Sequence, residues 1–132
     1  RSTQMVLSVL KAYGIKKIVA SPGTTNMAAD KKLCDALVKQ AESGKRVAAI
    51  CAAPSVFGGL GLLKGKTATC FPGFEDKLEG ASYTYTGVVT DGNVTTARGL
   101  GYALDLGIEI VKLLIDEDKA MQIKASIQYE DR

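Results

Sequence analysis

The chain has 132 residues, of which 46% are hydrophobic and 23% charged, and a formal net charge of +3. This size and balance indicate one domain, residues 1–132, that can bury an apolar core. Lys and Arg are scattered among Asp and Glu, which argues against a nucleic-acid partner, and no apolar run approaches the roughly 20 residues that cross a bilayer. We therefore expect a soluble, cytoplasmic protein without a nucleic-acid or membrane partner.

Cysteine and histidine usage limits the chemistry that the chain can perform. Its three cysteines, Cys34, Cys51 and Cys70, have no CxxC spacing, and histidine is absent. This odd number argues against both a disulfide framework and a zinc ribbon, so at least one thiol is expected to be free. Without imidazole, the chain alone cannot supply a Cys-His or Ser-His hydrolase mechanism. We expect neither a metal nor a cofactor.

The first third of the chain predicts two helices on either side of a short strand. Residues 3–13 place apolar side chains at helical spacing. Residues 16–21 form a short apolar run that a Pro-Gly pair ends, which is typical of a buried strand entering a loop. Residues 27–42 carry an apolar face opposite lysines and acids, which predicts a surface helix.

The next segment places a cysteine at a predicted strand end. Residues 46–51 are almost wholly apolar, as in a central parallel strand that helices cover on both faces. Pro54 is well tolerated in a first helical turn, so a short helix is expected to begin beside Cys51, weakened by its glycines. Cys51 is therefore predicted at a strand-to-helix turn. Residues 66–71 predict another short strand.

The last part of the chain predicts a hairpin and two helices. Two β-prone runs flank Asp91-Gly92, so residues 86–97 should form an antiparallel pair. Residues 102–115 describe a broadly apolar helix that must be well buried, and residues 117–126 a more exposed one. The order predicts an α/β, flavodoxin-like or Rossmann-like layered sandwich, with a mostly parallel sheet and helices on both faces. Ligands in such sheets bind beyond the carboxyl ends of the strands.

Two segments resemble a known family: GKRVAAICAAPSVFGGLGLLKGKTATCFPGFEDKL and VVTDGNVTTARGLGYALDLGIEIVKLL. Because of these two segments, residues 28–130 resemble the C-terminal half of proteins of the ThiJ/PfpI family, which includes deglycase-like and glyoxalase-like proteins. The resemblance implies that Cys51 is the reactive cysteine and that the backbone N–H of Ala52 helps to hold an oxyanion. A helix N-terminus beside Cys51 would favour thiolate, which could attack a dicarbonyl or be oxidised to sulfinate. The alternative is a small buried core residue.

The start of the chain departs from that family. The family's N-terminal half, with a glutamate that hydrogen-bonds the reactive cysteine, has no counterpart here. Residues 1–27 resemble instead the start of thiamine-diphosphate-dependent enzymes, although no magnesium motif accompanies them and thiamine diphosphate is not expected to bind. We therefore expect a chimera, engineered or recombined, in which residues 1–27 are a grafted α-β unit and residues 28–132 the ThiJ/PfpI-like half. A natural truncated relative is the alternative.

Two functions follow from this view of the chain. The favoured one is a scaffold without efficient catalysis, because the sequence offers no proton-transfer group near Cys51. The alternative is a glyoxalase-like or deglycase-like enzyme acting on α-oxoaldehydes through Cys51, with a small carbonyl compound as its ligand. Strand edges and apolar faces left uncovered by the missing half are expected to pair in a homodimer.

Four further residues are weaker candidates. Cys70 could resolve an oxidised Cys51, but core packing is the favoured role. Glu75 and Asp76 could replace the missing carboxylate, although surface acids are usually solvated. Arg98 either anchors the site or pairs with an acid.

Overall fold

The structure, a computed structural model, describes residues 28–130. The predicted helix 3–13 and strand 16–21 lie outside this range. In chain order the elements are α3 (Lys31–Glu42), β1 (Val47–Ile50), α4 (Pro54–Gly59), β2 (Thr67–Ala68), the 3-10 turn η1 (Glu75–Lys77), β3 (Ser82–Tyr83), β4 (Val88–Asp91), β5 (Val94–Ala97), the 3-10 turn η2 (Leu100–Tyr102), α5 (Ala103–Leu114) and α6 (Glu117–Ser126).

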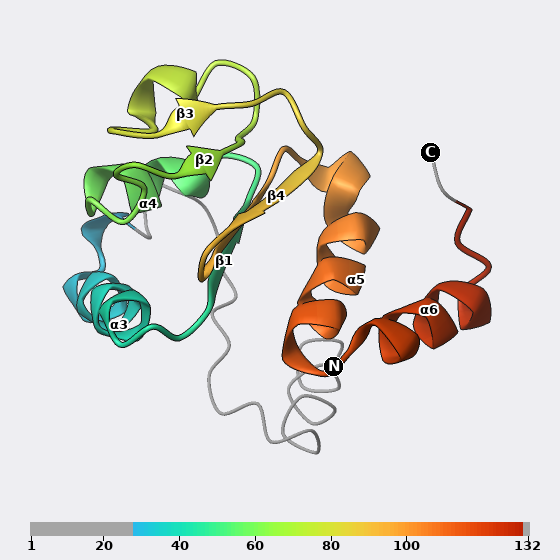
Figure 1. The fold of residues 1–132 in the computed structure, drawn as a ribbon. Helices are drawn as coiled ribbons and strands as arrows, with labels where there is room; N and C mark the ends of the chain where they lie inside the picture. The colour runs from blue at the N-terminus through green and yellow to red at the C-terminus, as the bar shows by residue number, and fades with distance from the viewer. Residues whose placement is uncertain (1–27, 131–132) are drawn as a thin grey trace.

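Three strands form the main sheet, in the order β1-β5-β4. β1 runs parallel to β5, and β4 pairs with β5 in the antiparallel sense. Helices α3 and α4 lie on one side of this sheet and α5 on the other (Figure 1). These layers confirm the predicted flavodoxin-like α/β class. Within residues 28–130, however, β1 is an edge strand with Ala48 exposed, so the expected central strand covered on both faces is not what this part of the chain shows.

The predicted hairpin is confirmed, with a small shift of its turn. Asp91 is the last residue of β4 and pairs with Val94, so the two turn residues are Gly92 and Asn93. Gly92 has a φ of 59°, a backbone conformation that favours glycine. Asp91 also accepts the backbone N–H of Thr67 at 2.8 Å, which fixes the start of β2 beside the hairpin.

The predicted strand 66–71 is shorter than expected and lies outside the main sheet. β2 contains only Thr67 and Ala68, and it pairs in parallel with β3, a strand that the sequence did not predict. Beyond β2, the backbone N–H of Thr69 donates to the side-chain oxygen of Thr96 at 3.0 Å. Thr69 thus has a side-chain partner in place of a backbone one, and β2 does not pair with a strand of the main sheet.

The core lies between the main sheet and helices α3 and α4. It is made of fully or almost fully buried apolar residues: Val47, Ala49, Phe57, Leu63, Ala68, Cys70, Leu78 and Val94.

Helix α5 was predicted to be well buried, and that prediction is wrong for the part of the chain that the structure describes. Leu106 is its only buried residue, whereas Leu104 and Leu114 are 56% and 48% exposed. α5 packs on β5 and α6, and within residues 28–130 these contacts leave Leu104 and Leu114 exposed. The homodimer expected from such uncovered faces stays a prediction. No helix in this range is long and apolar enough to cross a membrane.

Candidate functional site

Cys51 occupies a sharp bend between β1 and α4. It follows the last residue of β1, and α4 begins three residues later with Pro54 at its first position. Its φ of 65° lies in the left-handed region, which costs a residue other than glycine roughly 1–2 kcal/mol. Such strain gathers at functional sites. The structure thus places Cys51 at the predicted strand-to-helix turn.

Hydrogen bonds hold the backbone of Cys51 on both sides. Its N–H donates to the carbonyl of Ala97 at 2.9 Å, and its own carbonyl accepts the N–H of Phe71 at 2.8 Å. The N–H of Ala53 closes the bend by donating to the carbonyl of Ile50 at 3.2 Å. The bend is therefore fixed by two neighbouring segments, while the Cys51 residue stays half-buried and within reach of solvent.

Ala52 offers a backbone donor next to the thiol. Its carbonyl accepts both the N–H and the hydroxyl of Ser55, at 3.1 and 2.6 Å. Its N–H donates to no acceptor within residues 28–130. A free N–H on the residue after a nucleophile can stabilise developing negative charge on a substrate oxygen. The geometry is compatible with the role that the resemblance gives to Ala52.

Arg98 directly follows Ala97, whose carbonyl accepts the N–H of Cys51. Arg98 forms no ion pair within the described range. Its guanidinium carbon lies over two aromatic rings, 4.0 Å from the centroid of Tyr85 and 4.9 Å from that of Tyr102. The guanidinium also donates to the carbonyl of Tyr85 at 3.2 Å and to the hydroxyl of Tyr102 at 3.0 Å. Of the two roles left open for Arg98, these contacts favour an anchor over a partner for an acid.

Cys70 is fully buried in the core. Burial, with a smaller contribution from the negative charge of Glu75, raises the pKa of its thiol to about 11. The thiol is therefore protonated at neutral pH, which supports core packing over a resolving role.

Glu75 itself accepts the backbone N–H of Gly73 at 2.7 Å and so caps the turn after Pro72. Asp76 is exposed. Neither acid makes a hydrogen bond to Cys51.

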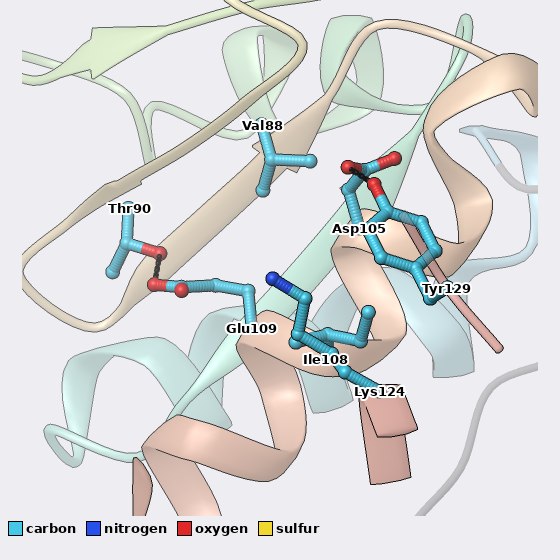
Figure 2. Close-up of a pocket in the computed structure, with 7 residues that line it drawn as sticks. All are labelled: Val88, Thr90, Asp105, Ile108, Glu109, Lys124 and Tyr129. Carbon is cyan, nitrogen blue, oxygen red and sulfur yellow. Dashed lines mark hydrogen bonds between the residues drawn. The ribbon is translucent and has the colours of Figure 1, made fainter. Parts of the chain in front are cut away.

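A separate hollow lies between β4, α5 and the end of the described chain (Figure 2). It encloses about 260 Å³ and contains neither Cys51 nor Ala52. Tyr129 donates to Asp105, and the Thr90 hydroxyl donates to Glu109 at 2.9 Å. None of these residues was expected from the sequence to line a site. The four-residue spacing of two acids on the apolar helix 102–115 was the available signal. The lining residues are Val88, Thr90, Asp105, Ile108, Glu109, Lys124 and Tyr129.

A layered α/β fold with a cysteine on a strained strand-to-helix turn defines the class of cysteine-elbow α/β proteins. A sequence model of the DJ-1/PfpI family matches residues 17–113. The chain therefore belongs to the DJ-1/PfpI family, the same family as the ThiJ/PfpI resemblance.

Individual relatives agree with this assignment. Protein DJ-1 homolog A from Arabidopsis thaliana is 39% identical over 131 residues, covering 93% of this chain and 33% of the relative. Glutathione-independent glyoxalase DJR-1.2 from Caenorhabditis elegans is 31% identical over 111 residues, covering 83% and 59%. The crystal structure of Drosophila melanogaster DJ-1beta matches with a TM-score of 0.78 at 30% identity, over 86% of this chain and 62% of that one. The chain thus spans between one third and about three fifths of these relatives.

The comparisons give no support to a junction near residue 27. The family match begins at residue 17, and the Arabidopsis relative covers 93% of the chain, so both extend into the segment that was assigned to another family. The resemblance of residues 1–27 to a thiamine-diphosphate enzyme has no support either. A strand followed by a Pro-Gly turn is common to many α/β proteins, so this short motif was a weak basis for a second family.

Proposed function

We propose that Cys51 is the reactive thiol of a cysteine-dependent activity on α-oxoaldehydes. The observation that carries this proposal is the left-handed backbone of Cys51, a residue other than glycine, at the end of β1. The family assignment and the printed name of the glyoxalase from C. elegans support it. The substrate class comes from that relative, whereas the position of the thiol comes from the geometry of this chain.

The elbow, which is the bend formed by Cys51 and Ala52 between β1 and α4, supplies the first chemical step. The Cys51 sulfur, as thiolate, forms a bond to the aldehyde carbon, and the electron pair of the C=O double bond moves onto oxygen. The free N–H of Ala52 holds that oxyanion until it takes a proton from solvent, which gives a hemithioacetal. The elbow stays in place during this step because Ala97 and Phe71 hold the backbone of Cys51.

Conversion of the hemithioacetal to a hydroxy acid needs a group that moves a proton between adjacent carbons. Within residues 28–130, no carboxylate makes a hydrogen bond to Cys51. This observation favours the second candidate, a scaffold without efficient catalysis. The two candidates predict different turnover for the same chain.

The test is methylglyoxal turnover, followed as lactate formation, by the 132-residue chain and by Cys51→Ala. The control is Cys34→Ala, which removes another half-buried thiol far along the chain from the elbow. Turnover that Cys51→Ala abolishes and Cys34→Ala retains would support the enzyme. Turnover equal to background in all three proteins would support the scaffold and reject the enzyme.

A further inference from the structure

An aromatic side chain is exposed beside the Cys51 elbow. Phe71 follows buried Cys70, yet it is 47% exposed. A single exposed apolar residue is ordinary on a protein surface. An exposed aromatic ring next to a strained, half-buried cysteine is of more interest, because apolar and aromatic side chains dominate the lining of small-molecule sites.

The contacts of Phe71 place its backbone beside Cys51 and its ring near Gly99. Its backbone N–H donates to the carbonyl of Cys51 at 2.8 Å, so its backbone lies on one side of the elbow. Ala97, which accepts the N–H of Cys51, lies on the other side. The Phe71 ring reaches Gly99, two residues beyond Ala97: a Cβ on Gly99 would lie 3.4 Å from the ring carbon Cδ2. The backbone of Phe71 therefore borders Cys51 on one side, and its ring lies near Gly99, which follows the segment that borders Cys51 on the other side.

A ring in this position offers an apolar surface to a group attached to the carbonyl that Cys51 attacks. A methyl group covers little of such a ring, whereas a phenyl group can stack on it or meet it edge to face. Arg98, the residue after Ala97, is charged, but its guanidinium lies over the ring of Tyr85 and donates hydrogen bonds to Tyr85 and Tyr102. Apolar contact with the exposed Phe71 ring is thus one available means of selection beside Cys51.

We propose that Phe71 is a specificity-determining residue of the Cys51 site and favours α-oxoaldehydes with an aromatic substituent, such as phenylglyoxal, over methylglyoxal. The inference rests on the proposed function for its substrate class. Aromatic pairs in proteins contribute enough to make the preference about fivefold in kcat/KM. Phe71→Ala removes this preference, and Phe71→Tyr retains it.

The selectivity can be measured without turnover, through alkylation of the thiol. The rate constants for N-phenylmaleimide and N-methylmaleimide are determined separately at Cys51 and at Cys34 by peptide mass spectrometry. The phenyl-to-methyl ratio at Cys51 should exceed that at Cys34 by about fivefold. Phe71→Ala should bring the two ratios together, while Phe71→Tyr and the distant control Leu114→Ala should leave the excess in place. An unchanged excess in Phe71→Ala, with circular dichroism like that of the wild type, would overturn the proposal.

Turnover of phenylglyoxal and methylglyoxal then separates this inference from the function on which it rests. If neither aldehyde is turned over but the maleimide excess depends on Phe71, the enzyme is rejected and the aromatic selectivity of the site stands. If both aldehydes are turned over at ratios that Phe71→Ala does not change, the selectivity is rejected and the enzyme stands.

Discussion

The carbonyl of Ala97 accepts the backbone N–H of Cys51 at 2.9 Å, which joins the end of β5 to the elbow that follows β1. Ala97 is fully buried and is the last residue of β5, where it also pairs with Ile50 and Val88. The strained bend at Cys51 is therefore attached to a fully buried residue that pairs with strands on both sides. This attachment lets the fold maintain a conformation that the cysteine alone would not adopt.

The backbone strain at Cys51 can be measured by replacing the residue with glycine and with alanine. Both changes remove the thiol, but only glycine adopts a φ of 65° without a steric penalty. We expect Cys51→Gly to be more stable than Cys51→Ala by about 1 kcal/mol, after the entropic cost of glycine is included. Urea denaturation gives the difference. Equal stability, or a more stable alanine variant, would show that the bend is not strained.

The sequence predicted the elbow because its signals are local. An apolar run ending at Cys51 and a proline at position 54 suffice to place a cysteine between a strand and a helix. The position of Phe71 beside Cys51 was not predicted, because it depends on a hydrogen bond between residues 20 positions apart in the sequence. The pairing of β2 with β3 was missed for another reason: a two-residue strand is too short to show a periodic pattern of apolar residues.

The apolar pattern of α5 was less informative. It predicted the helix but not its burial, because a pattern shows which side chains avoid water without showing which segment covers them. Leu104 and Leu114 belong to this apolar pattern, yet both are exposed within residues 28–130.

Two adjacent glycines in α4 should respond oppositely to alanine. A Cβ on Gly58 would overlap the carbonyl oxygen of Lys77 and lie 2.9 Å from the backbone nitrogen of Glu79, so η1 would have to move. We expect Gly58→Ala to lower the free energy of unfolding by about 2–3 kcal/mol. Gly59→Ala is the matched control, since nothing lies within 4 Å of its Cβ, and it should change stability by less than about 0.5 kcal/mol. Similar losses in both variants would contradict the close packing of α4 on η1.

The hairpin turn is tied to the end of α3 by one side chain. The amide nitrogen of Asn93 donates to the carbonyls of Ala41 and Lys45, both at 2.9 Å. Asn93→Ala leaves both carbonyls without this donor and should cost about 1–2 kcal/mol in thermal or urea unfolding. Gln40→Ala is the control, because the Gln40 side chain makes one exposed hydrogen bond, 3.3 Å to the carbonyl of Arg46, and its loss should cost clearly less. A loss in Asn93→Ala no larger than that of the control would mean that water replaces the amide at no cost.

The buried thiol of Cys70 should make the protein lose stability at alkaline pH. Its pKa rises from an ordinary value of 9.0 to about 11 on folding, chiefly because burial disfavours the thiolate. Between these values the unfolded chain has released the proton and the folded protein still holds it. The free energy of unfolding therefore falls as the pH rises from 9 to 11, by up to about 1.4 kcal/mol per pH unit, and Cys70 adds no pH dependence below about pH 8.

Cys70→Ala tests this contribution. The variant should be less stable than the wild type by about 1 kcal/mol at pH 7, because it leaves a small cavity in the core. The difference should shrink as the pH rises and vanish or reverse by pH 10.5, as followed by urea denaturation at half-unit steps. Burial is the chief cause that raises the pKa of Tyr83, and this contribution is common to both proteins; only the smaller contribution from the charge of Cys70 differs between them. Cys34→Ala, which keeps Cys70, should retain the alkaline loss of the wild type. A constant difference between wild type and Cys70→Ala across this range would mean that Cys70 ionises as readily in the folded protein as in the unfolded chain.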